Sequence, residues 1–375
     1  MRIAILGAGP AGLYLAYLVK RRRPDTDVTI IEQNPADATF GFGVVFSERA
    51  LEFLREDDEA TYSAIAPHVE SWRDIAVVHR GARVVIDGVG FAAIGRLKLL
   101  QVLQERARSV GVEPVYGRVV KNLDELSDTD LIVGADGVNS LVRRSYEKQF
   151  GASMRFLTNR FAWFGTSKRF DTLTQTFAET ELGFFNAHHY RYAPDLSTFI
   201  VEVDQATFVR AGFAQMGEAQ TRTLCEGVFS AALDGHALMS NNSIWRQFPI
   251  VHNEHWRVGK CVLIGDALHT AHFSIGSGTR LAMEDAIALD SALAVHPGDV
   301  GIALAAYETT RRPILEKLVS GANRSATWYE QFADHMQLAP FDFAMSYVTR
   351  SGRVDIDRLR KLSPLFVASY ERKRS

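Results

Sequence analysis

The spacing of apolar residues changes twice within the first thirty-two positions of the chain. Residues 2–6 form a short apolar run, the residues after position 9 repeat apolar positions at helical spacing up to a basic end at 21–23, and residues 28–31 form a second apolar run. Short apolar runs are typical of buried strands, and a period near 3.6 residues is typical of a helix. The opening of the chain therefore predicts a strand, a helix and a second strand.

Glycines mark the junction between this first strand and the helix, in the sequence Gly-Ala-Gly-Pro-Ala-Gly at 7–12. Strand, glycine turn, helix, strand and a terminal acid, Glu32, make the dinucleotide-binding βαβ pattern. In that pattern Gly7 allows the tight turn, Gly9 lets the backbone approach a pyrophosphate, and Gly12 lets helix and strand pack closely. Glu32 lies twenty residues after Gly12, where it can accept hydrogen bonds from an adenosine ribose. An ordinary glycine-rich turn is the alternative, and the spacing of all five parts disfavours it.

Further along, helical stretches alternate with short strands, and one region is rich in aromatic residues. The predicted elements are a hairpin at 75–86, a helix at 95–110, one or two strands at 112–120, a strand at 131–133, antiparallel strands within 161–202, a helix at 218–233, a strand at 261–264, helices at 279–293 and 300–323, and helical structure over the last fifty residues.

These elements predict an α/β fold in which one domain is built from separated pieces. A Rossmann-like nucleotide-binding domain is expected from residues 1–70, 92–158 and 255–325, an inserted domain of mainly antiparallel β-sheet from 71–91 and 159–254, and a C-terminal helical segment from 326–375.

Composition and charge exclude several classes of protein. The net charge of −2 leaves no basic excess for binding nucleic acid. Cys225 and Cys261 are too few for a disulfide framework and lack the spacing of metal ligands. No apolar run approaches the roughly 18 residues of a membrane span. Met1 leads directly into the first strand, so no cleavable signal is expected. We expect a cytoplasmic protein without a metal, a membrane or a nucleic-acid partner.

Two more glycine signals follow predicted strands. Asp136 and Gly137 come after the strand at 131–133, and Gly265-Asp266 comes after the strand at 261–264. Ligands of open α/β sheets bind beyond the carboxyl ends of the strands, so three such ends can converge on one extended ligand. A fourth, aromatic glycine loop around Gly43 allows close approach to a flat ligand.

In this order, the three motifs resemble those of class A flavoprotein monooxygenases of the para-hydroxybenzoate hydroxylase type. The resemblance covers about residues 1–325 and implies bound FAD, a transient NADH or NADPH, and a substrate domain on the inserted sheet. It implies that these residues bind the cofactor: Gly7, Gly9, Gly12, Glu32, Gly43, Arg96, Asp136, Gly137, Asp266, Gly276, Gly278 and Thr279.

Within that resemblance, each group of residues has a different place. The N-terminal glycines and Glu32 hold the ADP half of FAD, and Asp136 lies near the pyrophosphate and the path of the nicotinamide. Asp266 accepts from ribityl or ribose hydroxyls, and the loop at 275–279 offers N–H groups to the flavin ring. The alternative for Arg96 is a surface arginine at a helix start, and for Asp136 it is a turn-capping aspartate.

The segment after Gly265 departs from the common family pattern. His272 and Phe273 take the place of prolines, and Arg280 stands where asparagine is usual. Together with the string at 42–45 and Trp163, these departures resemble the salicylyl-CoA 5-hydroxylase branch. That resemblance implies hydroxylation of salicylyl-CoA to gentisyl-CoA through a hydroperoxyflavin, as part of aromatic catabolism. A tryptophan- or indole-derived substrate, a free phenolic one, a same-fold flavin-dependent reductase and a flavin-binding regulator are the alternatives.

A base that withdraws the phenolic proton would make the ring more nucleophilic. The candidates are His272, His188 and His189, although a lone histidine is more often structural. Alternation along a strand lets only one of His188 and His189 face a pocket. A CoA thioester also needs cations near the pocket, for which the candidates are Lys168, Arg169, Arg191 and Arg210. The expected partners are this aromatic substrate and O2, in a monomer or a homodimer.

Overall fold

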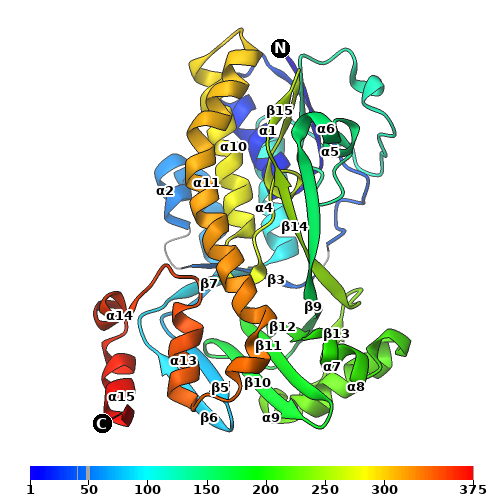
Figure 1. Ribbon diagram of the computed structural model, residues 1–375. Coiled ribbons are helices and arrows are strands. Elements are labelled where there is room, and N and C mark those ends of the chain that lie inside the picture. Colours follow the sequence, from blue (N-terminus) through cyan, green and yellow to red (C-terminus); the bar gives the residue numbers. More distant parts are fainter. Residues whose placement is uncertain (40, 48–50, 375) are drawn as a thin grey trace.

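The computed structural model describes residues 1–39, 41–47 and 51–374. Figure 1 shows two regions, one around the N-terminus and one that holds most of the green and red segments, joined by a long helix and a long pair of strands. The predicted fold class is confirmed: a Rossmann-like region, an antiparallel sheet region and C-terminal helices.

The N-terminal region is built on a five-stranded sheet in the order β15-β16-β8-β1-β2. Its strands are β1 (Arg2–Leu6), β2 (Asp27–Ile31), β8 (Leu131–Gly134), β15 (Arg257–Val258) and β16 (Cys261–Leu263). All neighbouring strands of this sheet are parallel, except that the edge strand β15 pairs with β16 in antiparallel orientation. The sheet thus gathers the strands that precede all three predicted glycine motifs.

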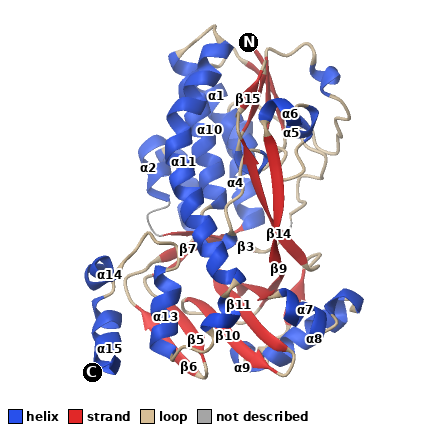
Figure 2. Ribbon diagram, viewed as in Figure 1, coloured by secondary structure: helices blue, strands red, loops and turns tan. Residues whose placement is uncertain are grey.

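Helices pack against this sheet and against one another (Figure 2). They are α1 (Pro10–Arg22), α2 (Glu52–Asp57), α3 (Glu59–Ile65), α4 (Arg96–Ser109), α5 (Leu141–Ser145), α6 (Glu147–Phe150), α10 (Gly278–Val295) and α11 (Val300–Glu330). In α1, residues 11–19 are all buried, because the helix lies between the sheet and its neighbours α4 and α10.

The second region is built on an eight-stranded sheet in the order β13-β9-β12-β11-β10-β5-β6, with β14 also paired to β9. Its strands are β5 (Ile75–His79), β6 (Ala82–Ile86), β9 (Ala152–Thr166), β10 (Leu173–Thr180), β11 (Gly183–Ala193), β12 (Leu196–Val203), β13 (Leu238–Ser240) and β14 (Arg246–Asn253). The hairpin at 75–86 and the antiparallel aromatic strands are therefore confirmed.

Shorter elements complete this region. Helices α7 (Gln205–Arg210), α8 (Glu218–Val228) and α9 (Ser230–Leu233) lie on one side, so the predicted helix at 218–233 is in fact two. The C-terminal helices are α12 (Phe332–His335), α13 (Pro340–Thr349), α14 (Ile356–Leu362) and α15 (Pro364–Arg374). α13 packs on β5 and β6 in a common hydrophobic core.

A small third sheet, β3-β7-β4, was not predicted. Its strands are β3 (Gly43–Ser47), β4 (Glu70–Trp72) and β7 (Phe91–Gly95). The prediction of strands at 112–120 was wrong. Among the described residues that segment makes a single bridge, between Ile31 and Val115, because it runs beside the edge strand β2 without sustained pairing.

Two elements join the regions. β9 pairs with β14 over most of its length, and in Figure 2 this ribbon extends from one region into the other. β9 also passes through the predicted domain boundary at residue 158, and the domain boundaries themselves stay a prediction. α11 continues to Glu330, beyond its predicted end at Asn323. No helix among the described residues is long and apolar enough to cross a membrane.

Candidate active site

A cavity of about 760 Å³ lies where the ends of the parallel strands face the eight-stranded sheet. Some of the predicted site residues line it: Gly9, Arg96, Gly137, His188, Asp266, Gly276, Gly278 and Thr279. The others lie outside its lining: Gly7, Gly12, Glu32, Gly43, Asp136, His189 and His272. The structure thus brings four separated motifs to one cavity.

The N-terminal glycine turn combines close packing with an open position. Gly7 has φ +102°, and a Cβ there would lie 2.3 Å from the carbonyl oxygen of Ala135. A Cβ on Gly12 would lie 2.1 Å from the carbonyl oxygen of Gly7. A Cβ on Gly9 would meet nothing within 4 Å. Gly7 and Gly12 therefore let the motifs approach one another, and Gly9 leaves its backbone open to the cavity.

Glu32 supports this turn through its side chain. Its carboxylate accepts a hydrogen bond from the Ala8 backbone N–H at 2.9 Å, and its other oxygen accepts from the Asn34 backbone N–H at 2.8 Å. The acid at the end of β2 thus lies directly beside the glycine turn.

The middle motif holds a buried acceptor without a partner. Asp136 Oδ2 accepts from the Leu141 backbone N–H at 2.6 Å, and Oδ1 is buried with no hydrogen bond among the described residues. Burial raises the pKa of Asp136, and hydrogen bonds from Ser140 and Leu141 oppose that shift. Arg143 joins this motif to the third one, because it donates to the carbonyls of Val138 and Ala267.

The third motif is held from behind by a buried ion-pair cluster. The Gly265 N–H donates to Asp285 at 3.0 Å, and Asp285 also bonds His269 Nε2 at 2.7 Å and Arg311 Nε at 2.9 Å. The cluster fixes the turn, so the side chain of Asp266 opens into the cavity. Asp266 is accessible there yet surrounded by protein, and burial raises its pKa while His269 and Arg96 oppose the shift.

Arg96 begins α4 directly after β7, and its backbone N–H donates to the Phe42 carbonyl at 2.8 Å. Among the described residues it forms no ion pair, although burial lowers its pKa and Asp266 opposes that shift. A cation in this position can receive an anionic or carbonyl oxygen from a ligand.

The loop before α10 forms another wall. Its 3₁₀ turn, Phe273–Ile275, ends at Gly276 with φ +58°, where a Cβ would lie 2.8 Å from Val45 Cγ1. α10 begins at Gly278, so the N–H groups of its first turn and the positive end of its dipole lie at the cavity.

Gly43 has a different place from the one expected. It begins β3, its N–H donates to Thr198 Oγ1 at 2.9 Å, and its carbonyl accepts from the Tyr190 hydroxyl at 2.9 Å. A Cβ there would lie 2.5 Å from Tyr192 Cβ. Glycine is needed here because β3 packs closely on β11, and Val44 and Val45 line the cavity in its place.

The two histidines of β11 face opposite sides of the sheet. His188 lines the cavity. His189 stacks on Phe199 with ring centres 5.1 Å apart and bonds Thr176 Oγ1 at 2.9 Å, within the core. Burial lowers the pKa of His189 to about 3. His189 therefore has no access to a ligand in the cavity.

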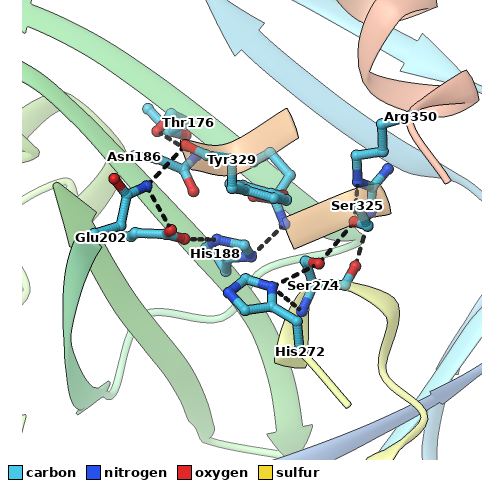
Figure 3. Close-up of polar contacts among 11 residues, drawn as sticks. Thr176, Asn186, His188, Glu202, His272, Ser274, Ser325, Tyr329 and Arg350 are labelled. Carbon is cyan, nitrogen blue, oxygen red and sulfur yellow. Dashed lines mark hydrogen bonds and ion pairs between the residues drawn. The ribbon is translucent and has the colours of Figure 1, made fainter. Parts of the chain in front are cut away.

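His188 belongs to a buried polar network (Figure 3). The Tyr329 hydroxyl donates to Gln175 Oε1 at 3.1 Å, which turns Gln175 Nε2 toward His188 Nδ1 at 3.0 Å. His188 Nε2 lies 3.2 Å from Glu202 Oε2. This pattern corresponds to the Nε2–H tautomer, with the Nδ1 lone pair as acceptor. Burial lowers the pKa of His188 and raises that of Glu202.

His272 lies behind the cavity wall. Its Nδ1 is 2.8 Å from Ser274 Oγ, and its ring stacks on Phe273 with centres 4.2 Å apart. Burial lowers its pKa to about 4, and Glu202 opposes that shift. The residue is 1% exposed and lies outside the cavity lining, so it supports the loop and does not reach the cavity.

Several residues of the site were not predicted, among them Gln175, Glu202 and Tyr347. Gln175 pairs with His188 in the register of β10 and β11, so strand alternation would have placed them on one face once the pairing was known. The candidate cations for a CoA thioester lie away from the cavity lining. Lys168 pairs with Asp234, Arg191 pairs with Glu70, and none of the four lines the cavity, whereas Arg96 and Arg246 do.

Comparison with known proteins gives consistent matches. A family model described as FAD binding domain matches residues 109–322, and one described as NAD(P)-binding Rossmann-like domain matches residues 5–49. The chain is 43% identical to salicyloyl-CoA 5-hydroxylase of a Streptomyces species, over 94% of this chain and 70% of that protein. It is 37% identical to 3-hydroxy-4-methyl-anthranilyl-[aryl-carrier protein] 5-monooxygenase of Streptosporangium sibiricum, over 89% and 90%.

Solved structures share the fold. Pseudomonas aeruginosa PqsL in complex with 2-aminobenzoylacetate aligns with a TM-score of 0.69 at 21% identity, over 89% of this chain and 98% of that one. A mutant of 2-methyl-3-hydroxypyridine-5-carboxylic acid oxygenase aligns with a TM-score of 0.71 at 18% identity, over 98% of both chains.

Proposed function

Because this chain belongs to the FAD-dependent aromatic monooxygenases, we propose that it hydroxylates salicylyl-CoA para to the phenol and releases gentisyl-CoA. The observation that carries the choice of substrate is the 43% identity to a salicyloyl-CoA 5-hydroxylase over 94% of the chain. The second relative is named for an anthranilyl group attached to a carrier protein. Both names describe an aromatic acid joined to a carrier, which favours a CoA-linked substrate over a free phenolic acid.

The residues present fit FAD. The glycine turn is a cradle that side chains would fill, Asp136 has a buried oxygen without a partner, and Arg96 is a cation without an ion pair among the described residues. When bound, FAD accepts a hydride from NADH or NADPH, activates O2 and delivers one oxygen atom to the ring. We assign its binding to the N-terminal turn, Arg96, the Asp136 and Asp266 motifs and the loop at 276–279.

We assign to His188 the role of the base that accepts the phenolic proton of the substrate. It is the predicted histidine that lines the cavity, and burial keeps it neutral near pH 7. Its Nδ1 has the lone pair that receives the proton, once the Gln175 amide gives way to the phenol. Glu202, bonded to Nε2, then stabilises the positive imidazolium. The phenolate that results is a stronger nucleophile than the phenol.

Aromatic side chains surround this position and exclude water from it. Phe161, Trp163, Phe248 and Phe273 line the cavity from β9, β14 and the flavin-side loop. Such walls limit the loss of activated oxygen to side reactions with water. Tyr347 closes the cavity from α13.

The test measures NADH or NADPH oxidation, O2 consumption and product mass for the purified holoenzyme with salicylyl-CoA, salicylate and an indole carboxylic acid. We expect salicylyl-CoA to stimulate reductant oxidation and to give a product heavier by one oxygen atom, taken from ¹⁸O2. If only salicylate or the indole carboxylic acid were hydroxylated, that compound would take the place of salicylyl-CoA as the proposed substrate. Reductant oxidation without any hydroxylated product would favour a reductase.

A further inference from the structure

A chain of hydrogen bonds joins the C-terminal helices to the loop that precedes α10. Arg350, just after α13, donates from Nη2 to the Ser274 carbonyl at 2.7 Å and from Nε to Ser325 Oγ at 2.9 Å. Ser325 Oγ lies 2.7 Å from Ser274 Oγ, which lies 2.8 Å from His272 Nδ1. Figure 3 shows these groups side by side, with Ser325 on α11 and Ser274 in the loop.

We propose that Arg350 is a positioning residue of the active site: it holds the loop at 272–278 against the cavity and sets the direction of the hydrogen bonds that end on His272. The proposal rests on the cofactor role assigned above to the loop at 276–279. It does not depend on which aromatic acid is the substrate.

The direction of the chain follows from the chemistry of its first member. A guanidinium group can only donate, so Ser325 accepts from Arg350. Ser325 and Ser274 are both buried, and Ser325 satisfies its own O–H by donating to Ser274. Ser274 then donates to His272 Nδ1, which leaves the proton of the neutral ring on Nε2. The Ser274 backbone N–H also points to His272 Nδ1, at 3.4 Å, which agrees with an acceptor at that nitrogen.

The position of Arg350 suits this task. Its guanidinium lies 3.9 Å from the centre of the Tyr347 ring, and Nη1 donates to the Tyr347 carbonyl at 2.7 Å. It forms no ion pair with a carboxylate among the described residues, so acceptors of the loop and α11 take its hydrogen bonds. All three of its nitrogens are engaged, and the aromatic face supports the charge.

The loop that receives these bonds lies at the cavity. Ser274, Gly276, Gly278 and Thr279 line it, and Phe273 lies between His272 and His188 with ring centres 4.2 and 5.1 Å away. A displacement of Ser274 therefore moves the start of α10 on one side, and Phe273 with the rings of His272 and His188 on the other. The bond from Arg350 to the Ser274 carbonyl ties this loop to a part of the chain beyond residues 109–322 of the family match.

The first test compares Arg350→Ala, Arg350→Lys and the control Arg324→Ala. Arg324 also donates to a backbone carbonyl near residue 350, that of Ser351, but its other hydrogen bond goes to Ser320 of α11 and not to the loop at 272–278. We expect Arg350→Ala to weaken FAD binding by about tenfold or more, because it removes three charge-assisted hydrogen bonds, one of which holds the Ser274 carbonyl of the loop. The FAD affinity of Arg350→Lys should lie between that of Arg350→Ala and that of the wild type. Arg324→Ala should bind FAD as the wild type does.

Two further readouts separate positioning from general stability. Added guanidinium should restore FAD affinity to Arg350→Ala, and hydrogen exchange of residues 270–279 should rise in that variant and fall on rescue. Wild-type FAD affinity and exchange in Arg350→Ala would overturn the proposal, as would a loss that guanidinium does not reverse. Since both readouts are made without substrate, rejection of salicylyl-CoA as substrate would leave them unaffected.

If Arg350→Ala does not fold, Ser325→Ala tests the same chain with the charge kept. It removes the middle hydroxyl, so Ser274 no longer has a fixed donor. The ¹⁵N signals of labelled histidine, assigned with His272→Gln, should show Nδ1 unprotonated in the wild type and a mixed tautomer in Ser325→Ala. An unchanged His272 tautomer in Ser325→Ala would contradict the direction proposed for the chain.

Discussion

The side of the cavity that we assign to the cofactor and the side that we assign to the substrate are built by different means. On the cofactor side, glycine turns at the ends of β1, β8 and β16 offer backbone groups, and each turn is held by residues that bond its backbone, such as Glu32 and Asp285. On the substrate side, the groups that we assign to the chemistry are side chains of β10, β11, β12, α11 and α13, and their hydrogen bonds join residues up to 154 positions apart in sequence.

This difference explains what each side tolerates. A site made of backbone is destroyed by any side chain that fills the space, even a methyl group. A site made of side chains keeps its shape under many substitutions but loses its proton chemistry when one group is exchanged. The predictions below separate the two cases, from the largest expected effect to the smallest.

Substitution of Gly12 by alanine should abolish FAD binding. Its Cβ would lie 2.1 Å from the Gly7 carbonyl oxygen, so α1 must move away from the turn, with an expected cost of about 3 kcal/mol or more. Flavin content after purification and the thermal unfolding midpoint measure the effect. Gly227→Ala in α8, where a Cβ meets nothing within 4 Å, is the control and should keep its flavin. A fully flavin-loaded Gly12→Ala would show that the turn is not a backbone cradle.

Substitution of each of the two neighbouring histidines of β11 by glutamine should have a different consequence. His188→Gln should keep FAD but lower the rate of hydroxylation by about 10²- to 10⁴-fold, because it removes the proton acceptor. His189→Gln should keep the rate and lower the free energy of unfolding by about 1–3 kcal/mol, because it disturbs the bond to Thr176 in the core. Single-turnover kinetics and urea unfolding of both variants make the comparison. Equal losses of rate in the two would contradict the assignment of His188.

The buried histidines should make the protein less stable as the pH falls. Burial lowers the pKa of His189 to about 3, whereas the unfolded chain takes up the proton near pH 6.5. The contribution of neutral His189 to the free energy of unfolding is therefore complete above pH 6.5. It decreases below that pH, by about 2 kcal/mol between pH 7.5 and pH 5. Burial raises the pKa of Glu202, which acts in the opposite direction, so wild type and His189→Gln must be compared. An equal pH dependence in both would exclude His189 as a cause.

The smallest effect is expected from the thiols, which neither side of the cavity uses. Cys225 and Cys261 are free and buried, and burial raises the pKa of both, that of Cys261 to about 11. At pH 8 they are therefore protonated and inaccessible, and a disulfide reagent such as DTNB should not modify them in the folded protein. Both should react in denaturant. Rapid modification of the native protein would show that one of them is exposed.

Local patterns predicted much of this fold. The β1-α1-β2 unit, the hairpin of β5 and β6 and the long helix α10 were predicted because their signals involve residues close together in sequence. The prediction of strands at 112–120 was wrong because this apolar segment pairs with β2 only at a single bridge. The β3-β4-β7 sheet was missed because its pairing joins residues that are between 19 (Trp72 and Phe91) and 52 (Gly43 and Gly95) positions apart.

The site divides in the same way. Gly9, Gly137 and Asp266 line the cavity as expected from their place after predicted strands, since the carboxyl ends of parallel strands meet at one edge of a sheet. Arg96 also lines it, and it was expected there only from the family resemblance. Gly43 lies outside the cavity lining, and only the packing of β3 on β11 shows that Tyr192 occupies the space beside it.

The sequence by itself thus determined a nucleotide-binding turn and its helix, because these depend on neighbours a few residues apart. It also determined the family of the chain, because three such local motifs occur in the order typical of the family. Only the tertiary structure decided that His188 and not His189 faces the cavity, that Glu202 and Gln175 complete its hydrogen bonds, and that Arg350 reaches Ser274. Those contacts depend on strand register and on the docking of α11 and α13, which join residues far apart in sequence and have no characteristic spacing.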